Sequence, residues 1–150
     1  MKLLVSACLL GAACRYDGCA KPMPEIQKLM ARHILIPVCP EIFGGMSTPR
    51  PPCELVGGKV LTRAGADMTA FYEKGAAETL KFARLFGCRA ALLKENSPSC
   101  GSGRIYDGSF SGVLKDGYGV TADLLRRENI RIYGEHEVVL LLEKEDESVE

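Results

Sequence analysis

The sequence predicts a three-layer α/β domain, in which a mostly parallel sheet is covered by helices on both faces. The first observation is that short, nearly continuous apolar runs alternate with segments of helical periodicity along the chain. The second is length, because 150 residues suffice for one domain that buries ~70% of its extended surface. Right-handed crossovers between parallel strands put helices on both faces, so the alternation predicts a single Rossmann-like αβα domain over residues 1–150.

Four apolar runs are the predicted strands of this sheet. They are residues 2–8, 34–38, 89–93 and 130–133. Their apolar residues are nearly continuous, which is typical of strands buried on both faces of a parallel sheet. A later run, residues 138–142, fits a fifth strand or a helix, because periodicity does not separate the two in so short a segment.

Three helices are predicted between the strands. Pro24 suits a first helical turn, and apolar residues follow it at helical spacing. The clearest helix covers residues 67–86, where an apolar stripe recurs at three- and four-residue steps and Gly87 provides a C-terminal stop. Thr121 is expected to cap a third helix that runs to about Glu128.

Two long irregular segments interrupt this alternation. Residues 43–58 include three prolines within positions 49–52, which excludes a helix or a central strand there. A short edge strand or hairpin is expected at residues 59–62. Residues 104–119 are rich in glycine and aromatic residues and are predicted to form a loop. A tail from about residue 143 is acidic and is expected to be solvated.

Composition favours a cytoplasmic protein. Lys+Arg and Asp+Glu number 19 each, and a zero net charge gives no general footprint for duplex nucleic acid or an anionic membrane. No window reaches the 18 or so apolar residues of a membrane span, and the N-terminus is a poor signal peptide. Seven cysteines, an odd number without a CxxC pair, favour the reducing cytosol, where thiols are free, catalytic or metal-bound. The sequence does not indicate an oligomeric state.

Three of the cysteines follow predicted strands and are expected to meet in space. Cys8 ends the first run, Cys39 follows the second, and Cys100 comes a few residues after the third. Because the carboxyl ends of parallel strands share one edge, where α/β proteins bind ligands, topology alone brings these thiols together. Three thiolates can bind a soft metal or an iron–sulfur cluster. Structural zinc normally takes four ligands, and His33 and His136 are poorly placed to supply the fourth.

The remaining cysteines leave alternatives open. Cys88 lies at a helix–strand junction and is interpreted as a small hydrophobic core residue. Cys14, Cys19 and Cys53 lie in loops around the predicted site. Each of these three is an alternative to one of the proposed metal ligands.

Polar residues near the same edge also have two interpretations each. Glu41, two residues after Cys39, is either a general base or the cap of the next turn. Ser97 either donates a hydrogen bond to a ligand or forms the turn around Pro98. Arg50 either binds an anionic or carbonyl group or clamps the proline-rich loop.

Several enzyme classes are excluded by spacing. A phosphate cradle of the Cys-x5-Arg type starting at Cys8 would need arginine at position 14, but Arg15 is one residue too late. Neither a GxGxxG motif after the first strand nor a GxxxxGK[ST] motif is present, so dinucleotide-binding and P-loop functions are not supported.

Five short motifs together resemble the thiouracil desulfidase family, and the likeness runs from residue 3 to about 135. The motifs are Ser6-Ala7-Cys8-Leu9-Leu10-Gly11, Cys14-Arg15-Tyr16-Asp17-Gly18, Cys39-Pro40-Glu41, Thr48-Pro49-Arg50-Pro51-Pro52 and Ser97-Pro98-Ser99-Cys100-Gly101. The resemblance implies a 4Fe-4S cluster with three cysteine ligands and a fourth iron that binds the sulfur of a thiolated pyrimidine. Water would then replace that sulfur without net redox change, converting thiouracil to uracil.

Carried over position by position, the resemblance implies a role for five residues. Cys8, Cys39 and Cys100 would hold the cluster, Glu41 would assist proton transfer and water attack, and Ser97 would orient the substrate. The sequence does not specify the natural substrate among 2- or 4-thiouracil, a thionucleoside and thiolated RNA fragments. Two other functions stay open: a non-enzymatic metal- or cluster-binding sensor or accessory module, and a thiol-based hydrolase that uses Cys8 or Cys100.

Overall fold

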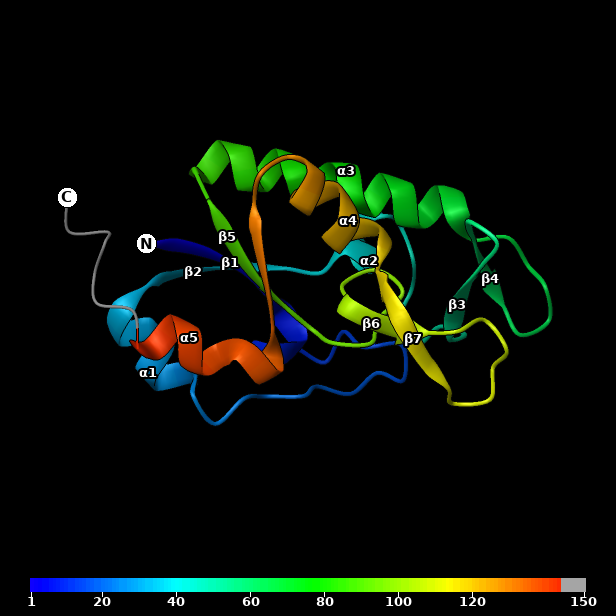
Figure 1. The fold of residues 1–150 in the computed structure, drawn as a ribbon, viewed down its shortest axis with the longest axis horizontal. Coiled ribbons are helices and arrows are strands. Elements are labelled where there is room, and N and C mark those ends of the chain that lie inside the picture. The colour runs from blue at the N-terminus through cyan, green and yellow to red at the C-terminus, as the bar shows by residue number, and fades with distance from the viewer. Residues whose placement is uncertain (144–150) are drawn as a thin grey trace.

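The protein, described here over residues 1–143 of a computed structural model, is built on a four-stranded parallel sheet (Figure 1). The strands lie in the order β2-β1-β5-β8, and every neighbouring pair is parallel. This confirms the predicted α/β class. The acidic tail beyond residue 143 lies outside the described residues. The sheet strands are β1 (Lys2–Ser6), β2 (Ile34–Val38), β5 (Ala90–Leu93) and β8 (Arg131–Gly134).

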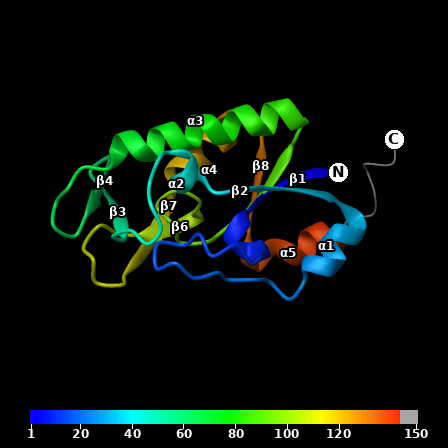
Figure 2. The same ribbon diagram turned by 180° about the vertical axis from the view of Figure 1, so that it is seen from behind.

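Helices cover both faces of the sheet, as Figures 1 and 2 show. Side chains of β1 alternate between two cores, because Leu3 and Val5 pack on one face and Leu4 packs on the other, all fully buried. None of the helices within residues 1–143 is long and apolar enough to cross a membrane. One face carries α1 (Ile26–Arg32) and α5 (Val138–Glu143), and the other carries α3 (Thr69–Phe86) and α4 (Val120–Arg127).

The order of the strands creates a switch point at β1. The chain leaves β1 for β2 on one side and later returns to β5 on the other side. The carboxyl ends of β2, β1 and β5 are therefore immediate neighbours at one edge. Ligands of open α/β sheets bind at such a position.

Two hairpins lie beyond this edge. The first pairs β3 (Cys53–Val56) with β4 (Lys59–Thr62). Strand β4 agrees with the element expected at residues 59–62, but β3 lies in the segment predicted to be irregular, so that prediction is wrong at residues 53–56. The second pairs β6 (Ser102–Tyr106) with β7 (Leu114–Tyr118), and the prediction of a loop at this position is wrong. Glycines face each other in the register of the second hairpin, so its strands carry little of the alternating pattern that identifies a strand.

Other element ends differ from the prediction in ways that matter for the site. Strand β1 ends at Ser6, and a short 3-10 helix, η1 (Ala7–Leu10), follows it. The late run is a helix, α5, whose Leu141 is fully buried against β1 and β5. Helix α4 begins one residue before Thr121, and Gly119 rather than Thr121 is its N-cap.

A short helix of four residues that the sequence did not predict, α2 (Pro40–Phe43), follows β2 and packs directly on α3. The contact is between backbones: a Cβ atom on Gly75 of α3 would lie 1.9 Å from the Pro40 carbonyl oxygen. A Cβ atom on Gly44 would likewise lie 2.1 Å from the Phe71 carbonyl oxygen. Glycine at both positions therefore allows α2 to lie flush against α3.

Replacing Gly75 with alanine tests this contact. In an exposed helix, Gly→Ala stabilises by about 1 kcal/mol, but here the added methyl group must separate α2 from α3. We expect Gly75→Ala to lower the free energy of unfolding by about 3 kcal/mol in chemical denaturation. Ala77→Ser, on the exposed side of the same helix, should change it by less than about 0.5 kcal/mol. A stabilised Gly75→Ala variant would contradict the proposed packing.

Candidate metal centre

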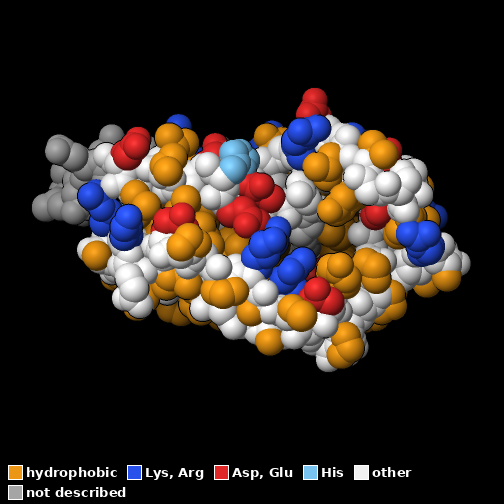
Figure 3. Space-filling model, turned by 90° about the horizontal axis from the view of Figure 1, so that it is seen from below, with side chains coloured by type: hydrophobic (Ala, Val, Ile, Leu, Met, Phe, Trp, Pro, Cys, Tyr) orange, Lys and Arg blue, Asp and Glu red, His pale blue; other side chains and the backbone are white. Residues whose placement is uncertain are grey.

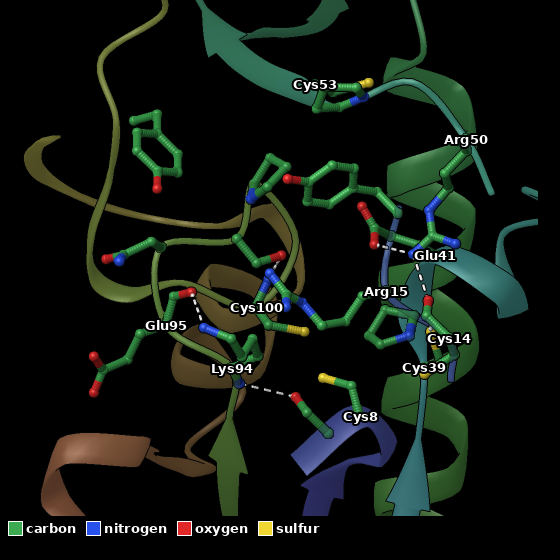
Figure 4. A pocket seen from close by; sticks show the side chains of 18 of the residues that line it. Cys8, Cys14, Arg15, Cys39, Glu41, Arg50, Cys53, Lys94, Glu95 and Cys100 are labelled. Carbon is green, nitrogen blue, oxygen red and sulfur yellow. Dashed lines mark hydrogen bonds and ion pairs between the residues drawn. The ribbon is translucent and has the colours of Figure 1, made fainter. Parts of the chain in front are cut away.

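A cavity of about 480 Å³ lies at the carboxyl ends of β1, β2 and β5 and reaches outward to the two hairpins. It opens on the face shown in Figure 3, where basic and acidic side chains border a hollow. Five of the seven cysteines line it, and the close-up in Figure 4 shows them. These five are Cys8, Cys14, Cys39, Cys53 and Cys100.

Cys8 is placed by the 3-10 turn that follows β1. Its side chain is 7% exposed, and its carbonyl oxygen accepts hydrogen bonds from the backbone N–H groups of Gly11 and Lys21. Burial and the neighbouring Cys39 together raise the pKa of the Cys8 thiol to about 11, although Lys94 opposes the shift. Without a metal this side chain is therefore a neutral thiol at neutral pH.

Cys39 follows β2 directly and is the N-cap residue of α2. Its sulfur lies 3.9 Å from the carbonyl oxygen of Cys14, so the loop after β1 covers it. Burial raises the pKa of the Cys39 thiol to about 11, although the backbone N–H of Ile42 favours the thiolate. The N-terminal end of a short helix thus holds the second thiol of the site.

Cys100 ends a tight turn that is locked to the start of α4. The Ser97 hydroxyl oxygen accepts hydrogen bonds from the backbone N–H groups of Ser99 and Cys100, both at 3.1 Å. The Ser99 and Thr121 hydroxyls are 2.8 Å apart, and the N–H groups of Thr121 and Ala122 donate to the Ser99 carbonyl. Thr121 therefore anchors the turn instead of capping the helix. Cys100 is 5% exposed, and burial raises the pKa of its thiol strongly.

The three thiols surround the cavity and do not converge on a point. Figure 4 shows Cys8 and Cys100 with their sulfurs turned toward one another and Cys39 on the facing wall. Across residues 1–143, no three or more His, Cys, Asp or Glu side chains are grouped so that they could hold a metal ion. A 4Fe-4S cluster takes each cysteine on a different iron, so its ligands surround a space. A cavity of this size, with two buried thiols and the half-buried thiol of Cys39, fits such a cluster.

Glu41 is the acidic residue closest in sequence to these thiols, and two donors hold its carboxylate. Oε1 accepts a hydrogen bond from the Tyr72 hydroxyl at 2.5 Å, and Oε2 accepts one from Arg50 at 2.6 Å. Arg50 is itself buried, and it also donates to the Cys14 carbonyl oxygen at 2.8 Å. The positive charge that balances the Glu41 carboxylate is therefore the buried Arg50. Each carboxylate oxygen accepts one of these two hydrogen bonds and has a second lone pair that neither donor uses.

Ser97 lines the cavity and has a structural contact as well. Its oxygen accepts the two backbone hydrogen bonds that shape the Cys100 turn. The hydroxyl proton is not used by those two bonds, so Ser97 can form the turn and still donate to a ligand. Both interpretations of this serine from the sequence are compatible with the structure.

Of the other four cysteines, two line the cavity and two lie away from it. Cys14 lines the cavity beside Cys39, and Cys53 lines its outer part next to Tyr72. Cys19 is exposed in the loop after β1, with its N–H bound to the Asp17 carboxylate. Cys88 is buried in the core between the sheet and α3, as the sequence suggested. Cys14 and Cys53 thus stay alternatives as ligands, whereas Cys19 and Cys88 lie elsewhere.

Two residues of the site were missed in the sequence. Tyr72 lies on the apolar stripe of the helix predicted at residues 67–86, yet its hydroxyl contacts Glu41. A tyrosine on a buried stripe is itself a signal, because a buried phenol usually finds a polar partner. Lys94 lines the cavity at the end of β5, where its ammonium group pairs with Glu135 at 2.7 Å. Its position directly after a predicted strand could have identified it.

Comparisons with known proteins agree with this fold and identify the family. A family model for 2-thiouracil desulfurase matches residues 3–137. The uncharacterized protein YbbK of Bacillus subtilis (strain 168) is 45% identical over 146 residues, which covers 91% of this chain and 97% of that protein. A solved structure of the 4Fe-4S-dependent thiouracil desulfidase TudS is 47% identical, with a TM-score of 0.89, and the match covers 93% of this chain and 94% of that one.

The parallel sheet with a cysteine-lined cavity at its carboxyl edge defines an α/β protein built around a soft-metal site. The family match over most of the chain then specifies which one: the chain belongs to the 2-thiouracil desulfurase family. This confirms the family that the five sequence motifs indicated.

The buried state of the thiols predicts how they react. In protein freed of metal, we expect iodoacetamide to modify exposed Cys19 well before Cys8 and Cys39 at about pH 8, because only the thiolate reacts. As pH rises toward the pKa values of about 11, modification of Cys8 and Cys39 should accelerate about tenfold per unit. Peptide mass spectrometry reads each site separately. Equal labelling of all three at about pH 8 would show that the thiols are not buried as described.

Proposed function

We propose that this protein is an iron–sulfur-dependent enzyme that removes sulfur from thiolated pyrimidines, converting thiouracil to uracil. The observation that carries the proposal is the cavity itself, where Cys8, Cys39 and Cys100 from three neighbouring strand ends face a half-buried carboxylate. Membership of the 2-thiouracil desulfurase family supports the reaction, and the likeness to TudS supports the cofactor.

Cys8, Cys39 and Cys100 are the residues that would hold a 4Fe-4S cluster. When bound by three cysteines, such a cluster supplies one iron without a protein ligand, which can act as a Lewis acid toward soft sulfur. Each of the three cysteines comes from a rigid part of the scaffold, namely η1, the start of α2 and the turn locked to α4. Binding the cluster requires all three thiols to lose their protons, so cluster assembly releases protons.

Glu41 and Ser97 would act on the attacking water and on the pyrimidine. In the net conversion, water adds oxygen to the ring carbon and the sulfur leaves as hydrogen sulfide, so no electron is gained or lost. Glu41 would take the two protons of the attacking water one after the other and pass each to the departing sulfur, which then leaves as hydrogen sulfide. Ser97 would donate its free hydroxyl proton to a carbonyl or ring nitrogen of the pyrimidine and so hold the ring in place.

The raised pKa values weigh against a thiol-based hydrolase. A cysteine nucleophile reacts as the thiolate, and its neighbours normally lower the pKa of its thiol. Burial instead raises the pKa of Cys8 to about 11 and raises that of Cys100 as well. These thiols suit metal ligation, because a metal ion displaces the proton directly.

Cysteine substitutions test the proposed ligands. Anaerobic reconstitution of the unmodified protein should give about four iron atoms per chain, with broad visible absorption. Replacing Cys8, Cys39 or Cys100 singly by alanine should lower bound iron to a small fraction of that value and abolish sulfide release from thiouracil. Cys88→Ala removes a buried thiol outside the cavity and should keep the iron.

Cys14→Ala and Cys53→Ala decide between the alternatives at the cavity. We expect both variants to retain iron, because Cys8, Cys39 and Cys100 suffice as ligands. Loss of iron in Cys14→Ala together with its retention in Cys39→Ala would replace Cys39 in the ligand set. Bound iron without sulfide release from any thiolated pyrimidine would favour a non-enzymatic cluster-binding protein.

Glu41→Gln tests the proton-transfer role apart from cluster binding. The amide keeps the size of the side chain but cannot accept a proton from water, so kcat for thiouracil should fall by about 10²- to 10⁴-fold at unchanged iron content. Glu128→Gln is the matched control, because Glu128 also pairs with an arginine, Arg84, but on the surface. Full activity of Glu41→Gln would remove Glu41 from the mechanism.

A further inference from the structure

The carboxylate of Glu41 is held at two points by residues from different parts of the chain. Arg50 comes from the proline-rich loop and binds Oε2, and Tyr72 comes from α3 and binds Oε1. The Glu41 side chain is 16% exposed and the Arg50 side chain 3% exposed, so solvent competes little for these contacts. The two contacts have different consequences for the orientation of the carboxylate.

The Arg50 contact is a single point. Only Nη2 reaches Glu41, and the same nitrogen also donates to the Cys14 carbonyl oxygen. Nη1 donates to the Ser47 carbonyl at 3.2 Å and to the Thr48 hydroxyl at 3.0 Å. Arg50 therefore ties the loop together and neutralises Glu41, but it lacks the two-point fork that fixes the plane of a carboxylate. The last torsion of a glutamate side chain is soft, so one contact leaves the plane free to turn.

Tyr72 supplies the second point from a rigid position. Its ring is 2% exposed and packs in a small core with Met46, Cys53 and Val60. The backbone contact of α2 with α3 at Gly75 fixes the helix that carries Tyr72 against the helix that carries Glu41. Burial and the adjacent Glu41 carboxylate raise the pKa of the Tyr72 phenol strongly, so it stays a proton donor across the neutral range.

We propose that Tyr72 is the positioning residue for Glu41, and that its hydroxyl fixes the plane of the carboxylate so that the free lone pairs face the cavity. Tyr72 does not belong to the described residues that line the cavity, so it acts on the substrate through Glu41. The inference rests on the proposed function, because the orientation of Glu41 affects the reaction only if Glu41 transfers protons. Tyr72 lies on α3, whereas Glu41 lies on α2.

Tyr72→Phe removes only the hydroxyl and keeps the ring in its core. We expect kcat for thiouracil to fall about 10- to 100-fold, because a small misplacement of a catalytic group has a cost of this order. KM should change less than about threefold, and iron content and melting temperature should stay near those of the unmodified protein. A crystal structure of the variant should show the Glu41 carboxylate turned or in two orientations.

A double-mutant cycle with Glu41→Gln separates positioning from a structural role. If Tyr72 acts only through Glu41, the double variant should have the same kcat as Glu41→Gln alone. Tyr133→Phe is the control for loss of a buried phenol hydroxyl, since Tyr133 is 4% exposed on β8 and lies outside the cavity lining. That control should keep kcat within about twofold.

Several outcomes would overturn the inference. They are a Tyr72→Phe kcat within about twofold of the unmodified enzyme, multiplicative losses in the double variant, and a loss of iron or of folded protein in Tyr72→Phe. The last outcome would assign the hydroxyl to structure instead of positioning. Absence of thiouracil turnover in the unmodified, iron-loaded protein is a separate result, which would overturn the proposed function and this inference with it.

Discussion

Close contact between backbones is the constraint on which the site depends. Pro40, which follows Cys39, touches α3 where a Cβ atom on Gly75 would lie 1.9 Å from its carbonyl oxygen. Ser99, which precedes Cys100, touches the start of α4 in the same way, because a Cβ atom on Gly119 would lie 2.5 Å from its carbonyl oxygen. In both cases the residue beside a proposed ligand rests on a helix without an intervening side chain. Such contacts fix the positions of two thiols more closely than side-chain packing could, since side chains can change rotamer and backbones cannot.

This rigidity is combined with burial that disfavours free thiolates. Burial raises the pKa values of Cys8 and Cys39 to about 11, and the proximity of the thiols to one another adds to the effect. Two ion pairs lie at the cavity, Glu41 with Arg50 and Lys94 with Glu135, and Arg15 lines it as well. Lys94 and Arg15 lower the pKa of the Cys8 thiol, but burial outweighs them, and a positively charged metal centre is what would stabilise the thiolates there. The site is suited to hold a cluster firmly and poorly suited to present a free cysteine nucleophile.

The sequence could predict that Cys8, Cys39 and Cys100 lie around one cavity, because this depends on the order of the strands and hardly on local structure. Four apolar runs suffice to predict a parallel sheet, and the sheet brings the residues after its strands to one edge, although η1 and α2 were not foreseen. The contacts of Glu41 could not be predicted in this way. Arg50 lies in a proline-rich loop whose path depends on contacts with Cys14, and Tyr72 occupies a stripe position typical of any core aromatic residue. The β6–β7 hairpin was missed because its pairing depends on backbone hydrogen bonds between glycine-rich strands with little sequence pattern.

The combination of thiols and a carboxylate around one cavity also constrains the chemistry. Thiols that follow strand ends surround the cavity, and a carboxylate anchored by α3 and the proline-rich loop faces the same space. Desulfuration of a thiolated pyrimidine requires different groups at two atoms. The sulfur requires a soft metal acceptor, and the carbon that carries it requires an oxygen nucleophile with a proton acceptor nearby. A carboxylate close to iron can compete with the substrate by binding the iron itself. Arg50 and Tyr72 each engage one oxygen of Glu41, so the carboxylate is held by donors of its own. The two residues that hold Glu41 therefore also favour its proposed role as a proton acceptor over a role as a metal ligand.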